Sequence, residues 1–175
     1  MEVRFGWAVA AALIAGPAAA QDSEVLYSNR AWSVEVSRFD DGTYGCVAQV
    51  SSPDSSESFS IWTFQEGGVR LQFYSTQWEF GEGETADLEV QIDRRGAWTL
   101  TAAELYLNSV LFDLPAGDEG ARFVREVSNG TILYLRNDSG EDVQSYSLSG
   151  SNASIDALIE CEGAITVNSP KNPFN

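Results

Sequence analysis

The fold is decided by residues 32–50, WSVEVSRFDDGTYGCVAQV. Apolar side chains occupy alternate positions on both sides of the turn signal Asp40-Asp41-Gly42. They are Trp32, Val34 and Val36 before the turn, and Tyr44, Cys46, Ala48 and Val50 after it. A period of two gathers side chains on one face only when the chain is extended. The stretch therefore predicts two antiparallel strands joined by a tight turn.

The same alternation begins at Ala31 and continues as far as Leu114. It predicts further strands at residues 59–64, 69–74, 88–92, 98–101 and 110–114. Turn signals rich in glycine separate these segments, at residues 67–68, 81–83, 94–96 and 115–117. Many short strands at such spacing are typical of an antiparallel β-sandwich or barrel-like domain. We therefore expect a mainly β fold.

After residue 117 the spacing of apolar residues changes to that of a helix. Either Ala121, Val124 and Val127, or Phe123 and Val127, share one side of a short helix that Asp118 is expected to cap. Gly130 is expected to end this helix in the left-handed conformation. The C-terminal third therefore begins with a helix rather than another strand.

A hairpin and a second helix complete the expected fold. The hairpin strands are predicted at residues 131–136 and 143–148, on either side of a polar turn. The second helix is predicted over residues 152–160, with Ser151 as its cap and Gly163 as its end. The chain is thus expected to carry two short helices in its last third.

The chain contains two cysteines, Cys46 and Cys161. Strand alternation turns Cys46 toward the core, and helical spacing turns Cys161 inward together with Ala153 and Ala157. Residues 1–20 have the pattern of an export signal, and in an exported protein an even pair of cysteines usually forms a disulfide. We therefore predict a Cys46–Cys161 bond, with two separate buried thiols as the alternative.

The first twenty residues have the pattern of an export signal. Arg4 lies in a short n-region, residues 5–15 are apolar, and small residues follow, with alanine at the two positions that a signal peptidase reads. Cleavage after Ala20 would leave Gln21 as the first residue. The apolar run is shorter than the ~20 residues that span a bilayer, so a retained membrane helix is the alternative interpretation. We expect a periplasmic or secreted protein.

We expect one domain over residues 21–168 and a loose tail at residues 169–175.

The composition of the chain limits the classes of partner that it can bind. The net charge is −16, from 26 acidic and 10 basic residues. Nucleic acid and anionic lipid are bound by clustered Lys and Arg, so this charge argues against both as partners. We expect a monomer without cofactors and without stable membrane insertion after signal cleavage, acting on an unknown protein or cell-envelope ligand.

The chain has no histidine, which removes the commonest general base and most zinc sites. We therefore predict no catalytic residues and no metal site. An acidic run around two glycines offers oxygen ligands of the kind that calcium prefers, but its spacing fits no calcium loop. It consists of Glu79, Glu82, Glu84, Asp87 and Glu89. A solvated hairpin end is the other interpretation, and cation binding here stays open.

Two tryptophans are candidates for a binding surface. Trp32 and Trp98 are in phase with aliphatic positions and are expected in the core. Trp62 alternates against Phe59 and Ile61, and Trp78 lies among polar residues. We therefore predict Trp62 and Trp78 as surface rings that can contact a ligand.

The C-terminal third resembles the end of a known family. The segments that carry the resemblance are GARFVREVSNG (residues 120–130), ILYL (residues 132–135) and SYSLSG (residues 145–150), followed by Ala153 and Leu158. They look like the exported invasion-associated locus B proteins of alphaproteobacteria. The opening WSVEV (residues 32–36) with Cys46 is also similar. The chain differs in carrying Val36 in a region where that family often has a cysteine. The resemblance implies a small β-rich envelope protein linked to host or cell-surface interaction, and it supplies no catalytic residue.

The sequence as a whole predicts an exported, non-catalytic binding protein whose ligand is unknown. Two alternatives stay open. One is a carboxylate-based enzyme acting on polysaccharide, since a chain this acidic offers many carboxylate pairs. The other is an inhibitor or a carrier, in which a barrel encloses an apolar cavity for a small ligand.

Overall fold

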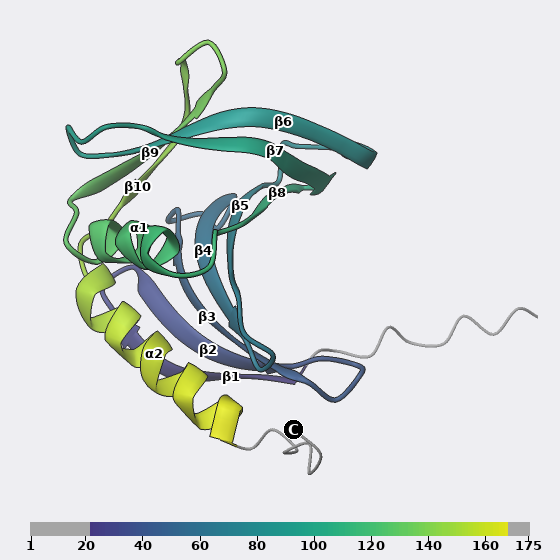
Figure 1. Cartoon of the computed structure of the whole chain (residues 1–175), viewed down its shortest axis with the longest axis vertical. Coiled ribbons are helices and arrows are strands. Elements are labelled where there is room, and N and C mark those ends of the chain that lie inside the picture. Colours follow the sequence, from purple (N-terminus) through teal and green to yellow (C-terminus); the bar gives the residue numbers. More distant parts are fainter. Residues whose placement is uncertain (1–21, 168–175) are drawn as a thin grey trace, which may run out of the picture.

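The structure is a computed structural model that describes residues 22–167. These residues form one ten-stranded antiparallel sheet and two helices (Figure 1). The strands are β1 (Asp22–Asn29), β2 (Trp32–Arg38), β3 (Tyr44–Ser51), β4 (Glu57–Phe64), β5 (Val69–Ser75), β6 (Phe80–Ile92), β7 (Trp98–Leu107), β8 (Ser109–Asp113), β9 (Ile132–Asn137) and β10 (Asp142–Ser147). The helices are α1 (Asp118–Ser128) and α2 (Ser151–Val167). The export signal and the tail predicted from the sequence lie outside the described residues.

The sheet is open and strongly bent. Its order is β1-β2-β3-β4-β5-β8-β7-β6-β9-β10, so β1 and β10 are its two edges. The bend brings β10 over β4 and β5, where the Tyr146 ring lies 5.9 Å from the Phe59 ring and 6.3 Å from the Phe73 ring between centroids. The Trp32 indole also donates to the Ser147 carbonyl, at 3.2 Å. The predicted mainly β fold is confirmed. The single sheet folds back on itself, so that its two halves face each other as in a sandwich, and it does not close into a barrel.

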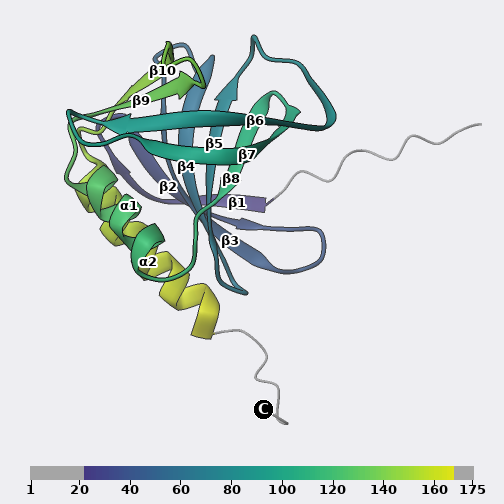
Figure 2. The ribbon, with the colours of Figure 1, turned by 45° about the horizontal axis from the view of Figure 1, so that its top comes forward.

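The core lies between the two halves of the folded sheet, and the helices cover one side of it (Figures 1 and 2). α2 packs on β1 to β4, and α1 packs against α2. The largest side chains with almost no exposed surface include Trp32, Phe59, Phe73 and Phe123. Both helices sit on the core side of β2 to β5, so no helix within residues 22–167 covers the opposite face of these strands.

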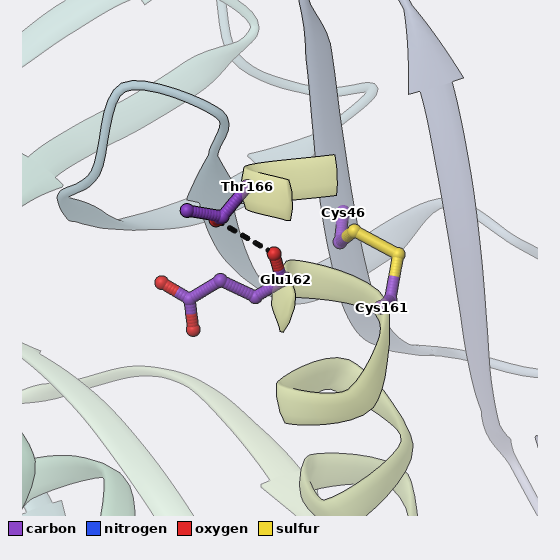
Figure 3. Close-up of a disulfide and its surroundings, with 4 residues drawn as sticks. All are labelled: Cys46, Cys161, Glu162 and Thr166. Carbon is purple, nitrogen blue, oxygen red and sulfur yellow. Dashed lines mark hydrogen bonds between the residues drawn. A yellow bond between two sulfur atoms is a disulfide. The ribbon is translucent and has the colours of Figure 1, made fainter. Parts of the chain in front are cut away.

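The predicted Cys46–Cys161 disulfide is present and joins β3 to α2 (Figure 3). Both cysteines are almost fully buried, with 0% and 5% of their surface exposed. One turn further along the helix, the Thr166 hydroxyl donates to the Glu162 carbonyl at 2.8 Å (Figure 3). The bond therefore fastens the closing helix to the first half of the sheet.

Strand β1 has no counterpart in the sequence prediction. Its apolar residues Val25 and Leu26 are adjacent and therefore break the alternation. A bulge between Val25 and Tyr27 interrupts the pairing with β2, and Val25 and Leu26 are 59% and 48% exposed. Because its apolar residues do not alternate, an edge strand of this kind cannot be predicted from sequence periodicity.

Strands β6 and β7 are longer than predicted. The expected turn at residues 81–83 is wrong, because β6 runs through it and pairs with β7 on both sides of an irregularity between Phe80 and Glu84. Gly83 adopts a positive φ of 76° within this irregularity. The acidic run that surrounds these glycines is thus mostly strand.

The predicted ends of α1 are wrong in detail. Gly117 occupies the N-cap with φ 86° and no side-chain hydrogen bond, and Asp118 is the first helical residue. Its carboxylate lies where the helix dipole favours negative charge. Gly130 is not left-handed; a Cβ there would lie 2.6 Å from both Ile92 Cγ2 and Leu148 Cδ1. Close packing, rather than backbone conformation, requires glycine at this position.

The predicted ends of α2 also differ from the structure. The Ser151 hydroxyl donates to the Val127 carbonyl at 2.9 Å. It therefore bonds to a carbonyl at the C-terminal end of α1 and does not cap α2. Gly163 does not end α2, which continues to Val167. Gly163 lies on the exposed side, while Ile165 is only 6% exposed and packs into the core. Burial of Ile165 accounts for the extra turn. No helix within residues 22–167 is long and apolar enough to cross a membrane.

Candidate functional site

The uncovered face of β2 to β5 and β8 carries a cluster of rings and polar groups. Alternation along β4 creates it, because Phe59, Ile61 and Thr63 point to the core and Trp62 and Phe64 point the other way. Cross-strand pairing places Arg70 beside Trp62, and Asp113 beside Arg70. We call this cluster the aromatic face; it consists of Phe39, Trp62, Phe64, Arg70, Gln72 and Asp113.

The three rings of the aromatic face hold one another in place. Trp62 and Phe64 lie nearly parallel, at 9° and 6.4 Å between centroids. Phe39 reaches over from the turn after β2, with its ring 6.3 Å from each of the other two. A Cβ at Gly45 would come within 2.9 Å of the Phe39 ring, so glycine at this position lets that ring lie against the sheet. All three rings are half-buried and keep part of their surface open to solvent.

A chain of hydrogen bonds fixes the indole of Trp62. Its Nε1 donates to Gln72 Oε1 at 2.9 Å, and Gln72 Nε2 donates to Ser109 Oγ at 2.9 Å. The three residues lie on the neighbouring strands β4, β5 and β8. Since both ends of the Gln72 amide are engaged, the orientation of the Trp62 ring is set before any ligand arrives.

Arg70 and Asp113 form a two-pronged ion pair next to the rings. Arg70 Nε donates to Asp113 Oδ1 at 2.7 Å, and Nη2 donates to Oδ2 at 2.9 Å. The hydrogen bond from Arg70 lowers the pKa of Asp113, and the reciprocal bond raises the pKa of Arg70. Both groups are therefore charged at neutral pH, and together they carry no net charge.

Two hollows lie on either side of this ion pair, and Arg70 and Asp113 line both of them. A hollow of about 510 Å³ lies at the ends of the strands, where Phe39 and Phe64 contribute to its wall. A second, of about 270 Å³, is lined by Glu104 of β7 among others. Figure 1 shows the side of the sheet away from the helices as the open side of its arc. The two hollows thus adjoin the Arg70–Asp113 end of the aromatic face, and Trp62 lines neither of them.

The ion pair makes a small, pH-dependent contribution to stability. The lowered pKa of Asp113 means that the contribution is present above the unfolded-state pKa near ~4 and is lost as the pH falls through the folded-state value. Its side chains are 36% and 68% exposed, so solvent limits it to less than about 1 kcal/mol. We expect Asp113→Asn to lower the free energy of unfolding by that amount in urea titrations at pH ~7, and by a smaller amount at pH ~3. Glu66→Gln, which removes an exposed carboxyl in the adjoining turn, is the control. An Asp113→Asn deficit that is equal at both pH values would contradict the assignment.

The structure does not bring the two predicted surface tryptophans together. Trp62 lies on the aromatic face. Trp78 lies in the loop before β6, with its ring 5.6 Å from Phe80, and packs against the edge of the core. An apolar hollow of about 240 Å³ beside it is also lined by Leu105 and Val110, which belong to the core side of the sheet. The Trp62 ring therefore lies on the aromatic face, and the Trp78 ring lies on the core side of the sheet.

A further groove lies between the two helices and the sheet, and it shares Val69 and Leu114 with the larger of the two hollows. It has a volume of about 540 Å³, and its walls are mainly apolar. Val69, Leu114, Val124, Ile155 and Ile159 are among its lining residues. Ile159 is 57% exposed, which is high for an isoleucine. We call this the helix groove. It is the apolar hollow that the carrier alternative would require for a small ligand.

The acidic run contributes to the long arm formed by β6 and β7. Asp87 Oδ1 accepts a hydrogen bond from the Ala102 amide at 2.7 Å, which supports the backbone where Ala102 has a positive φ of 55°. Among residues 22–167, no three side chains of His, Cys, Asp or Glu lie close enough together to hold a metal ion.

Sequence reasoning missed most of the aromatic face. Phe64 could have been found, because it follows Trp62 by two positions on the same strand face. The ion pair could not, because Arg70 and Asp113 are 43 positions apart and meet only through the register of β5 with β8. Phe39 follows β2 in a turn, where alternation does not say which way a ring points.

Comparison with known proteins points to a structural relationship. No family model and no curated protein matches the chain. Among solved structures, the crystal structure of invasion associated protein B from Bartonella henselae is similar, with a TM-score of 0.50 over 78% of this chain and 97% of that chain. The two sequences are 11% identical, so the likeness concerns the fold alone. The resemblance noted in the sequence is therefore supported as a structural relationship to invasion associated protein B.

Proposed function

We propose that this protein is exported and acts without catalysis as a binding protein of the cell envelope, and that the aromatic face is its recognition surface. The observation that carries the proposal is the prearranged Trp62 ring beside the Arg70–Asp113 pair. Groups that are already fixed lose little conformational entropy on binding, which leaves more of the contact energy as affinity. Trp and Arg are also the side chains that most often dominate binding surfaces.

Two further observations support a location outside the cytoplasm. A disulfide that spans 115 positions is typical of proteins that fold in an oxidising compartment. The fold is similar to that of a protein named for invasion. Together with the export pattern of residues 1–20, they support a periplasmic or secreted protein that contacts an envelope or host-surface ligand.

A small-ligand carrier is the second candidate function, because the helix groove offers an apolar surface of suitable size. The groove is open on one side and carries Arg125 and Asp156 among its lining residues. Trp62 does not line the helix groove, although the larger hollow beside the ion pair shares Val69 and Leu114 with it. Substitution of Trp62 should therefore leave binding in the helix groove unchanged.

The proposal is tested by retention of the mature protein, residues 21–175, on isolated envelopes of the producing cell. Trp62→Ala removes the central ring, so we expect retention to weaken at least about tenfold, the loss usual for a dominant interface residue. Trp78→Ala is the matched control, since it removes the same side chain from the opposite face. The unfolding midpoints of both variants are measured in parallel.

Equal retention of wild type and Trp62→Ala would contradict the proposed recognition surface. A loss in Trp78→Ala alone would move the site to the other face. Export is tested on the same material, because N-terminal sequencing of protein recovered from the periplasm should begin at Gln21.

A further inference from the structure

We propose that the aromatic face binds a neutral glycan chain, with sugar rings lying on Trp62 and Phe64 and sugar hydroxyls bonding to the Arg70–Asp113 pair. The inference rests on the proposed function, since it names the class of ligand for the same surface. Three properties of the surface carry it: the position of the rings, the spare hydrogen-bonding capacity of the ion pair, and the distribution of charge.

The rings lie at fixed positions, and part of their apolar surface is open to solvent. Trp62 is held by Gln72 at one end and flanked by Phe64 at 6.4 Å with a plane angle of 9°, so the two ring planes have nearly the same orientation. A pyranose ring has faces made of C–H groups and a rim of hydroxyls. An aromatic surface with polar groups at its border suits that arrangement, because the sugar face packs on the ring while its rim reaches the polar groups.

The ion pair offers donors and acceptors side by side. A guanidinium has five N–H donors and a carboxylate has about four acceptor positions. Arg70 and Asp113 use two of each on one another, which leaves about three donors and two acceptor positions for a ligand. Neighbouring sugar hydroxyls both donate and accept, so they can use both kinds of position. An apolar ligand would bury these remaining donors and acceptors without partners, which is costly.

Charge separates a neutral glycan from an acidic one. Arg70 is already neutralised by Asp113, and Glu104 adds a negative charge close enough to raise the pKa of Arg70 further. The chain as a whole carries a net charge of −16. A polyanion would therefore be repelled at long range and would find no free cation among the residues of the aromatic face. An uncharged polyhydroxyl ligand meets neither penalty.

The hollows leave room for a chain rather than a single sugar. They lie on both sides of the Arg70–Asp113 pair, with volumes of about 510 and 270 Å³. A glycan centred on the pair could extend into each of them. Phe39 and Phe64 line the larger hollow, and Glu104 lines the smaller.

The test is isothermal titration of the mature protein with a panel of linear oligosaccharides. The neutral members are gluco-, manno- and galacto-oligosaccharides, and the acidic member is an oligogalacturonate of matched length. We expect at least one neutral member to bind with a Kd between ~10 μM and ~1 mM, and the oligogalacturonate to bind more weakly. Trp62→Ala should weaken the neutral interaction at least about tenfold, and Trp78→Ala should leave it unchanged.

Further variants keep the test valid if Trp62→Ala fails to fold. Trp62→Phe retains a ring but loses the bond to Gln72, so we expect a smaller loss. Asp113→Asn removes the charge but retains the shape of the side chain, and should weaken binding without creating affinity for an apolar ligand. The urea midpoint of each variant shows whether a loss of binding reflects unfolding.

The outcomes separate the glycan inference from the proposed function. Binding of no neutral member, tighter binding of the oligogalacturonate, or an equal effect of Trp78→Ala overturns the inference. If retention on envelopes still depends on Trp62 in that case, the recognition surface stands and its ligand belongs to another class, such as a peptide. If neither retention nor glycan binding depends on Trp62, both proposals fail.

Discussion

Cys161→Ser lowers the free energy of unfolding by about 5 kcal/mol, the loss expected when a closed loop of this length is released. The Cys46–Cys161 bond joins positions 115 apart and so restricts most of the unfolded chain. For a domain of about 150 residues, that loss corresponds to a fall in Tm of about 10–20 °C. Urea and thermal unfolding of wild type and variant measure it directly.

Two controls separate the bond from the packing around it. Cys46→Ser should cost about as much as Cys161→Ser, because either change removes the same restraint. Ile159→Ser places a hydroxyl on an exposed position of the same helix and should cost much less. Under denaturing, non-reducing conditions the intact wild-type chain should show no free thiol. Two free thiols, or a loss below about 1 kcal/mol in Cys161→Ser, would show that α2 is held without the bond.

Phe59→Ala lowers the free energy of unfolding by about 3–5 kcal/mol, the range typical of a fully buried ring. Phe59 is 0% exposed and lies at the centre of the core. Its ring stacks on Phe73 at 5.0 Å and meets Trp32 edge to face at 6.3 Å. It also contacts Tyr146 across the fold of the sheet, so its removal opens a cavity between the two halves. Urea unfolding gives the size of the effect.

Phe64→Ala is the matched control, because Phe64 belongs to the same strand and points to the opposite, half-exposed face. It should cost clearly less stability than Phe59→Ala while affecting ligand binding more. The reverse order of stabilities would mean that the aromatic face, and not the assigned core, holds the sheet together. That result would also weaken the case for a recognition surface, since a ring that supports the fold has less freedom to serve a ligand.

The sequence predicts the parts of this fold that depend on periodicity. Trp32 and Val34 are buried as their alternation requires, and Cys161 points inward as its helical spacing requires. The disulfide follows from these two patterns together with the export signal. The sequence prediction fails where strand pairing, rather than periodicity, determines the structure. Strand β1 has adjacent apolar residues at a bulged edge of the sheet, and β6 passes through two glycines because β7 pairs with it.

The candidate site was only partly accessible to the same reasoning. The position of Trp62, out of phase with Phe59 and Ile61 on its strand, predicts a surface ring. The polar sequence neighbours of Trp78 predict a surface ring, but in the structure Trp78 contacts Phe80 and the edge of the core. The Arg70–Asp113 pair depends on which strands are neighbours, and β8 lies beside β5 only through the long excursion of β6 and β7. No local pattern encodes that order.

The indole N–H groups of the mature protein provide the most direct test of the recognition surface. Each lies in a different environment: Trp32 donates to the Ser147 carbonyl, Trp62 to Gln72 and Trp98 to Glu126, while Trp78 lies near Phe80. The measurement is a two-dimensional ¹⁵N NMR titration of the labelled protein with soluble material released from isolated envelopes. We expect the Trp62 indole signal to move most, together with backbone amides of β3, β4, β5 and β8. Shifts that gather instead on α1 and α2 around the helix groove, or at Trp78 with Trp62 unmoved, would contradict it.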